Sequence, residues 1–183
     1  VLSSWQVVVG EYAKMGKEIK ITTIPYEFKG FMGMRNFIIQ DSEGRKLAWA
    51  NSNWTHLDIS TGLPARLTPA DTDNYVLGEM DYAPRKIKLP EDMIAQEAFT
   101  VQKHHLDTNH HVNNCQYVCM AEDFLPESFK IYQMRAEYKM QAKLGDVICP
   151  KVKTETDKVV VSLDNIEGKA YAIVEFLKKE GDI

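Results

Sequence analysis

Apolar and polar residues alternate through most of residues 1–60, which is the period-two pattern of strands with one buried face. The run Glu18-Ile19-Lys20-Ile21 is a clear example. Glycines 30 and 33 and the run Asp41–Gly44 mark turns between such stretches. Strands are predicted at Trp5–Val9, Lys17–Phe28, Met34–Gln40 and Lys46–Ile59. These residues are therefore predicted to form an antiparallel meander that contains no helix to cover its apolar face.

Residues 61–94 show little periodicity and are predicted to form a connector. Prolines and turn-forming Asp and Asn residues recur through it: Pro64, Pro69, Asp71, Asp73, Asn74, Pro84 and Pro90. The alternation resumes at Ala95, and turns are predicted at Gly145-Asp146 and at Asp164–Gly168. The strands predicted for this second half are Gln96–Gln102, Tyr132–Ala142, Asp146–Thr156, Lys158–Leu163 and Lys169–Lys179.

One helix is predicted in the second half, capped by Asn113 and stopped by Pro126. Asn113 followed three residues later by Gln116 resembles a capping box, in which two side chains bond to the backbone at a helix start. Apolar side chains would cover most of the helix: Val112, Cys115, Val118, Cys119, Met120 and Phe124. A helix that is apolar all round is a buried helix. We therefore predict an α+β fold of the hotdog type, an antiparallel sheet wrapped around a long apolar helix.

The composition is that of an ordinary globular protein and excludes several classes of function. Of the 183 residues, 44% are hydrophobic and 26% charged. No apolar run approaches the ~18 residues of a membrane span. The net charge of −4 argues against a nucleic-acid-binding protein. No export signal is visible, and an odd number of cysteines, with Cys115 and Cys119 read as core thiols, predicts a reducing compartment, the cytoplasm.

A polar cluster of Asp107, Asn109, His110 and His111 stands immediately before the predicted helix. Carboxylate and imidazole groups perform general acid–base catalysis, and a helix N-terminus offers N–H groups and partial positive charge to an oxyanion. Asp and Asn at this position are more often caps and turn formers. The combination D-x-N-x-H-V-N-N favours a catalytic site over that structural interpretation.

The block Asp107–Asn114 followed by Tyr117 is similar to the D-x-N-x-H-V-N-N-x-x-Y motif of a known family, the acyl-acyl carrier protein (acyl-ACP) thioesterases of plants and bacteria. The first half of the chain resembles the same family, in the same order. Its successive strands are matched by Trp5–Val9, Gly33–Phe37 and Ala50–Trp54, and the start of its linker by Leu63–Leu67.

The resemblance implies two hotdog domains in tandem and a thioesterase that hydrolyses fatty acyl-ACP to free fatty acid and ACP in fatty acid biosynthesis. Residues 1–70 would form the N-terminal hotdog on the acyl-chain side, 71–94 the linker, and 95–183 the C-terminal hotdog with the catalytic motif. Family members carry a strand and a first hotdog helix ahead of the segment that starts here at Val1, so the first hotdog is expected to be incomplete in this chain. The implied partner is ACP carrying a fatty acyl chain, and a homodimer is one expectation; no nucleic acid and no membrane span are expected.

Four residues are candidates for the site: Asp107, Asn109, His111 and Gln141. Asp107 would activate water or attack the carbonyl directly, and His111 is the other candidate base because imidazole titrates near neutral pH. Asn109 can only orient, since an amide does not titrate. Backbone N–H groups of residues 112–114 would polarise the thioester oxygen. Gln141 would position water or hydrogen-bond the substrate.

The chain departs from the family at Gln141-Ala142, where plant members carry a glutamate and then a cysteine. A cysteine nucleophile at position 142 is therefore excluded. An acidic partner at position 141 is also excluded, unless Glu137 or another carboxylate substitutes for it. Because the carrier protein is expected to be acidic and this chain is itself net negative, docking would need a local basic patch, for which Lys139 and Lys143 are the candidates.

Three alternatives stay open beside the acyl-ACP thioesterase. The first is an acyl-CoA thioesterase of the hotdog superfamily, and the second is a non-catalytic acyl-binding protein. The third is a zinc site, because His111, Cys115 and Cys119 fall four residues apart on one helical face. Cysteines on an apolar helix behave more often as small hydrophobic residues, and the C-x-x-C spacing of a structural zinc site is absent. We therefore expect no metal and no cofactor.

Overall fold

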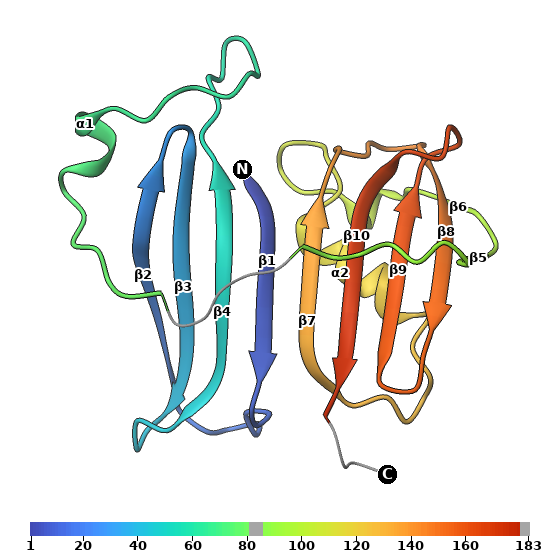
Figure 1. Ribbon diagram of the computed structural model, residues 1–183, viewed down its shortest axis with the longest axis horizontal. Helices are drawn as coiled ribbons and strands as arrows, with labels where there is room; N and C mark the ends of the chain where they lie inside the picture. Colours follow the sequence, from blue (N-terminus) through green and yellow to red (C-terminus); the bar gives the residue numbers. More distant parts are fainter. Residues whose placement is uncertain (81–85, 180–183) are drawn as a thin grey trace. The chain divides into compact units, whose positions relative to one another are not determined.

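The computed structural model describes residues 1–80 and 86–179, and the chain divides into two compact units, Val1–Arg85 and Lys86–Ile183. Figure 1 shows the elements of both units. Pro84 of the predicted connector and residues 180–183 of the predicted C-terminal hotdog lie outside the described residues. No helix in the described ranges is long and apolar enough to cross a lipid bilayer.

The first unit is built on an antiparallel meander, as its alternating sequence predicts. Its strands lie in the order β2-β3-β4-β1. Within residues 1–80 its one helix is the short α1 (Pro69–Thr72), where Thr68 donates to the side chain of Asp71 through both its N–H (2.8 Å) and its hydroxyl (2.7 Å). The strands are β1 (Leu2–Val9), β2 (Ile19–Lys29), β3 (Met32–Asp41) and β4 (Lys46–Thr55).

The chain beyond α1 runs back along β2 and β3. The N–H of Gly78 donates to the carbonyl of Pro25 at 2.9 Å, and the amide of Asn36 donates to the carbonyl of Glu79 at 2.7 Å. A Cβ at position 78 would lie 2.6 Å from a methyl group of Ile24, so glycine allows this close approach. The connector predicted from its lack of periodicity is therefore partly packed against the sheet.

The second unit is an antiparallel sheet in the order β7-β10-β9-β8-β5, with β6 also pairing with β8. Its helix α2 (Asn114–Glu122) packs on β9 and β10. The strands are β5 (Ile94–Ala95), β6 (Phe99–Thr100), β7 (Ile131–Tyr138), β8 (Val147–Thr154), β9 (Lys158–Asp164) and β10 (Ala170–Lys178). A sheet wrapped on a helix is the predicted hotdog architecture.

The core of the second unit lies between α2 and the sheet. The residues of the sheet that face it are fully buried: Ala136, Val161, Leu163, Val174 and Phe176 are all 0% exposed. Tyr117, Met120 and Ala121 supply the buried face of the helix. Each large side chain buried in this way contributes about 1.5–3 kcal/mol relative to leaving it in water.

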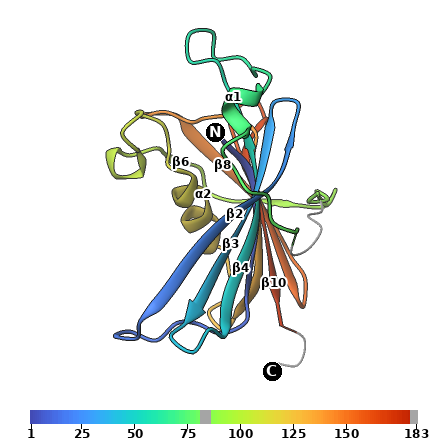
Figure 2. The same cartoon turned by 90° about the vertical axis from the view of Figure 1, so that its left-hand side faces the viewer.

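Residues 86–95, here called the strap, cross the face of the sheet opposite to α2 (Figures 1 and 2). Ile87 packs on Val160 and Ile173 in a second, smaller apolar cluster. The strap ends as β5, where Ile94 pairs with Val152 of β8. Both faces of the second unit's sheet are therefore covered, one by the helix and one by the strap.

The prediction of a helix buried all round is wrong. Cys115 and Cys119 are exposed, as is Glu122, because only the opposite face of α2 packs on the sheet. The prediction counted both cysteines as apolar and therefore missed that one face of the helix is exposed. The two thiols are not core residues. The helix also ends at Glu122, before Pro126. The strand predicted at residues 96–102 is reduced to the two-residue strand β6, and β5 lies just ahead of the predicted range.

Candidate active site

The D-x-N-x-H block forms a tight hairpin between Leu106 and Val112, which pair as an antiparallel bridge. The N–H of Asp107 donates to the carbonyl of His111 at 2.9 Å, and the N–H of His110 donates to the carbonyl of Asp107 at 3.1 Å. His110 closes the loop with a φ of 61° and is the one non-glycine residue with positive φ in the described parts of the chain. A turn followed by one left-handed residue is a common three-residue hairpin loop. For histidine that conformation costs about 1–3 kcal/mol, which the surrounding bonds must offset.

The carboxylate of Asp107 holds this hairpin from inside. Its Oδ1 atom accepts hydrogen bonds from the N–H of Asn109 at 2.8 Å and of His111 at 3.3 Å. Its Oδ2 atom has a weaker contact, 3.5 Å, with the amide nitrogen of Asn109. Partial burial acts to raise the pKa of Asp107, but these N–H donors outweigh burial and lower the pKa below its usual 3.8. The side chain is therefore an anion at neutral pH, with Oδ2 as the oxygen left for chemistry.

The start of α2 follows the hairpin directly, and Asn113 is its N-cap. The Oδ1 atom of Asn113 accepts from the N–H of Cys115 at 2.9 Å, which confirms the predicted N-cap, but within the described residues Gln116 does not form the predicted capping box with it. The N–H of Asn113 donates to the carbonyl of His105 at 2.9 Å, at the end of a short 3-10 helix, η1 (Lys103–His105). The hairpin, η1 and the helix start are thus joined by backbone hydrogen bonds.

The predicted role of the helix-start amides as oxyanion donors needs correction. The N–H of Val112 donates to the carbonyl of Ala142 at 2.9 Å, and that of Asn113 is bound to His105. Only the N–H of Asn114, of these three amides, is without a hydrogen bond to another described residue. A reacting oxygen at this helix end would therefore meet one free amide instead of three.

Gln141 is carried to the hairpin by the segment that follows β7. Ala142 pairs with Val112 as given above, and Lys143 forms a bridge with His111. Gln141 itself is exposed, whereas Ala142 is 0% exposed. The Gln141 side chain makes no hydrogen bond to Asp107, Asn109 or His111 in the described parts of the chain. The fold thus places all four candidate residues on two segments that are joined by their backbones.

Glu137 is not positioned to replace an acid at position 141. Its Oε1 atom accepts from the N–H of Ile87 in the strap at 2.9 Å, and its Oε2 atom accepts from Lys139 Nζ at 2.7 Å. The next residue, Tyr138, donates its hydroxyl to the carbonyl of Asn114 at 3.0 Å, on the α2 side. Since successive strand residues face opposite ways, Glu137 points away from the hairpin. Burial acts to raise the pKa of Glu137, but the hydrogen bond and charge of Lys139 and the N–H of Ile87 lower it.

The zinc alternative finds no support in the arrangement of ligands. No group of three or more His, Cys, Asp and Glu side chains suited to a metal ion occurs within residues 1–80 and 86–179. Cys115 and Cys119 lie one turn apart on the exposed face of α2. Burial and the neighbouring thiol raise the pKa of Cys119, which disfavours the thiolate that a metal needs.

Two tyrosines that sequence reasoning did not assign to the site connect its parts. Tyr117 is 2% exposed, and its hydroxyl accepts from the N–H of Ala142 at 2.8 Å. Tyr138 reaches the first turn of α2 through the bond to Asn114 already described. For Tyr117 the signals were its place at the end of the D-x-N-x-H-V-N-N-x-x-Y block and the polar atom that it carries into an otherwise apolar helix face, because a buried tyrosine hydroxyl usually finds a partner.

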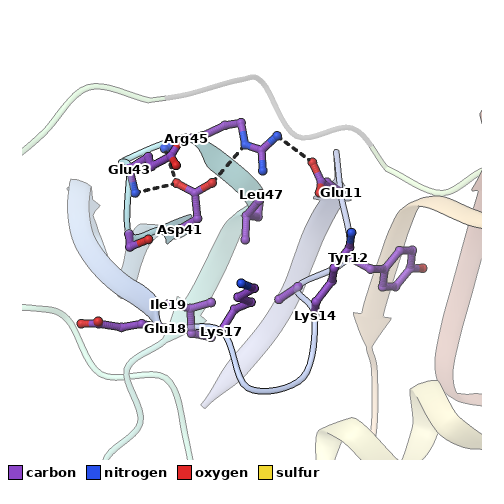
Figure 3. Close-up of a pocket in the computed structure, with 12 residues that line it drawn as sticks. Glu11, Tyr12, Lys14, Lys17, Glu18, Ile19, Asp41, Glu43, Arg45 and Leu47 are labelled. Atoms are coloured by element: carbon purple, nitrogen blue, oxygen red, sulfur yellow. Dashed lines mark hydrogen bonds and ion pairs between the residues drawn. The ribbon is translucent and has the colours of Figure 1, made fainter.

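A separate surface pocket of about 240 Å³ lies in the first unit, where the end of β1, the start of β2 and the β3–β4 hairpin meet (Figure 3). Arg45 pairs there with Glu11 at 3.1 Å and with Asp41 at 3.0 Å. Asp41 also accepts from the N–H groups of Glu43 and Arg45. These paired charges hold the β3–β4 turn beside the pocket.

The fold and the hairpin site define a protein of the hotdog class, and solved structures agree. An acyl-ACP thioesterase from Bacteroides thetaiotaomicron has a TM-score of 0.88 at 20% identity, over 98% of this chain and 76% of that one. A 12:0-ACP thioesterase from Umbellularia californica has a TM-score of 0.84 at 17% identity, over 98% and 74%. A MaoC-like dehydratase from Phytophthora capsici has a TM-score of 0.66 at 14% identity, over 98% and 71%. At such identities the likeness establishes the fold alone.

Family models decide the identification. The model of the acyl-ACP thioesterase N-terminal domain matches residues 1–75, and that of the C-terminal domain matches residues 88–176. No curated protein matches the sequence closely enough to count as a relative. The chain belongs to the acyl-ACP thioesterase family, and the expected class of enzyme, a thioester hydrolase, is confirmed.

Proposed function

We propose that this protein hydrolyses fatty acyl-ACP to free fatty acid and ACP with Asp107, Asn109, His111 and Gln141 as its site. The observation that carries the proposal is the Asp107 carboxylate, which is held as an anion by two backbone N–H groups while its Oδ2 atom has a weak contact, 3.5 Å, with the amide nitrogen of Asn109. Family membership supports the reaction, and the hairpin supports the choice of residues.

Asp107 Oδ2 takes a proton from water, which attacks the thioester carbonyl, or it attacks the carbonyl itself and forms an anhydride, which water then hydrolyses to free fatty acid and the Asp107 carboxylate. His111 is the second base, and it lies on the same hairpin, joined to Asp107 through the backbone. Asn109 holds Asp107 through both its N–H and its amide. Gln141 positions water or donates to the substrate carbonyl, since its amide cannot act as a base. The C–S bond breaks, and the thiol of the carrier leaves with a proton.

The domain roles and the setting of the reaction are part of the same proposal. Residues 1–70 bind the acyl chain, 71–94 connect, and 95–183 carry the catalytic groups. The enzyme acts in the cytoplasm, in fatty acid biosynthesis, and works as a homodimer. Sedimentation of the purified protein tests the last point, because a dimer has twice the mass of the 20.9 kDa chain.

Turnover on matched substrates tests the reaction. Acyl-ACP and acyl-CoA with the same acyl chain are compared at equal concentration, and release of free fatty acid is measured. A much higher kcat/KM on acyl-ACP supports the proposal, and a preference for acyl-CoA replaces it with the acyl-CoA thioesterase. Tight binding of acyl-ACP without release of fatty acid replaces it with the acyl-binding protein.

A further inference from the structure

The chain leaves the sheet at the end of β7, and residues 139–142, here called the Gln141 segment, follow a separate path. The N–H groups of Lys139 and Met140 both donate to the carbonyl of Tyr171, at 2.8 and 3.2 Å. Beyond that point no strand of the sheet is paired with the segment within the described residues. Its position beside the hairpin must therefore be set by other contacts.

One such contact comes from the middle of α2. The N–H of Ala142 donates to the hydroxyl of Tyr117 at 2.8 Å, and the carbonyl of Ala142 accepts from the N–H of Val112. Both backbone polar groups of Ala142 are thus used, one by the helix and one by the hairpin. Burial raises the pKa of Tyr117 to about 12, so the phenol is neutral in any assay near neutral pH.

A second contact fixes the other end of the segment. Tyr138, the last residue of β7, donates its hydroxyl to the carbonyl of Asn114 in the first turn of α2. The rings of Tyr117 and Tyr138 lie with their centroids 6.0 Å apart and tilted by 50°. Two neighbouring tyrosines therefore tie the residues on either side of the Gln141 segment to the same helix.

We propose that Tyr117 and Tyr138 are positioning residues, which hold the Gln141 segment so that the Gln141 side chain stands at a fixed place beside the Asp107 hairpin; this rests on the proposed function. Phenylalanine would fill the same volume at both positions. The hydroxyls are what add precision: that of Tyr117 binds the N–H of Ala142, which no strand pairs within the described residues, and that of Tyr138 binds the carbonyl of Asn114 in α2. Small displacements of a group that orients water or substrate are costly to the chemical step.

The test removes the two hydroxyls one at a time. Tyr117→Phe and Tyr138→Phe are compared with Tyr132→Phe, a matched control on β7 whose hydroxyl makes no hydrogen bond within the described residues. All three are assayed on a short acyl thioester, and each is repeated in the Gln141→Ala background. Folded content is measured for every variant, and turnover is expressed per folded molecule.

The expected result is a kcat about 10- to 100-fold lower for Tyr117→Phe with KM nearly unchanged. The loss should be smaller for Tyr138→Phe and absent for the control. In the Gln141→Ala background neither tyrosine substitution should lower kcat further, since residues that act through one group are not additive. Additive effects, an unchanged kcat in both variants, or full activity of Gln141→Ala would overturn the proposal.

Amide hydrogen exchange separates this proposal from the proposed function. Loss of the Tyr117 hydroxyl should raise the exchange rate of the Ala142 amide about tenfold or more, because its acceptor is gone. If that amide exchanges as in the unmodified protein, Tyr117 does not hold the segment. If wild-type protein and Asp107→Asn hydrolyse thioester equally, the proposed function fails. The exchange rate of the Ala142 amide still shows in that case whether the Tyr117 hydroxyl holds the segment. If Tyr117→Phe does not fold, Tyr138→Phe carries the same comparison.

Discussion

Replacing Asp107 by asparagine and by alanine separates the structural role of this carboxylate from its chemical role. An asparagine keeps a side-chain oxygen where Oδ1 now accepts from the N–H groups of Asn109 and His111. It removes the negative charge that the proposed mechanism needs. Alanine removes both the charge and the acceptor. The two variants should therefore lose similar activity but different amounts of stability.

The magnitudes decide between the two roles. A net hydrogen bond contributes about 0.5–1.5 kcal/mol, and Asn109 is exposed, so water replaces part of what alanine loses. We expect Asp107→Ala to lower the free energy of unfolding by about 1–2 kcal/mol and Asp107→Asn by less than half of that. Loss of a general base lowers kcat by a factor of about 100 to 10,000, which corresponds to about 2.7–5.4 kcal/mol. The loss of activity should thus far exceed any loss of folded protein.

Fatty acid release from acyl-ACP and urea unfolding are measured on the same preparations. The pH dependence adds an independent check. Because the folded-state pKa of Asp107 is lowered, both its stabilising effect and its activity as a base are present above 3.8 and are lost as the pH falls through the depressed value. The reasoning is refuted if Asp107→Asn folds and keeps near-normal turnover, because the charge would then be unnecessary.

Four further outcomes are expected. Glu137→Gln should lower the free energy of unfolding by about 1 kcal/mol. Because the pKa of Glu137 is lowered in the folded protein, its carboxylate stabilises the fold less as the pH falls below 4.5, so the variant should show a weaker dependence of stability on pH there. Urea unfolding across pH checks this. Ala142→Cys should bring no gain in turnover and no trapped acyl-enzyme in mass spectrometry, since position 142 is fully buried. Asn113→Ala should lower the melting temperature through a loss of about 1 kcal/mol, with Asn113→Asp as a control that keeps the cap. Lys143→Glu should weaken association with acyl-ACP at low salt more than Lys139→Glu does, because Lys139 is already paired with Glu137; an equal loss on a carrier-free thioester would count against docking at either residue.

Much of the fold could be predicted from alternation alone, because each strand must bury one face. The strand β2, for example, lies where Ile19 and Ile21 alternate with polar residues, but these two side chains are 40% and 65% exposed, so alternation predicted the strand and not the burial of its apolar face. The helix was placed correctly at its start because Asn113 carries a local capping signal. The exposed face of the helix was missed because a free cysteine behaves as a small hydrophobic residue, so Cys115 and Cys119 were expected to be buried.

The candidate site was predictable only as far as it is local. Asp107, Asn109 and His111 occupy one hairpin, so their motif could be read from consecutive residues. The pairing of Ala142 with Val112 joins residues 30 positions apart, and nothing in either stretch specifies it. The sequence also could not show that the N–H of Val112 bonds to Ala142 and that the N–H of Asn113 bonds to His105. Non-local contacts of this kind require the packed structure.

The strap has a practical consequence for anyone who wishes to study the second unit alone. A polypeptide beginning at the first residue of β6 would lack Ile87, and Val160 and Ile173 would then face water. The buried Glu137 carboxylate would also lose the amide that now donates to it. Such a fragment should aggregate or unfold readily, whereas one that begins ahead of Ile87 keeps both faces of the sheet covered. Residues 86–95, which look dispensable in the sequence, therefore belong in any fragment that is meant to keep the sheet of the second unit covered.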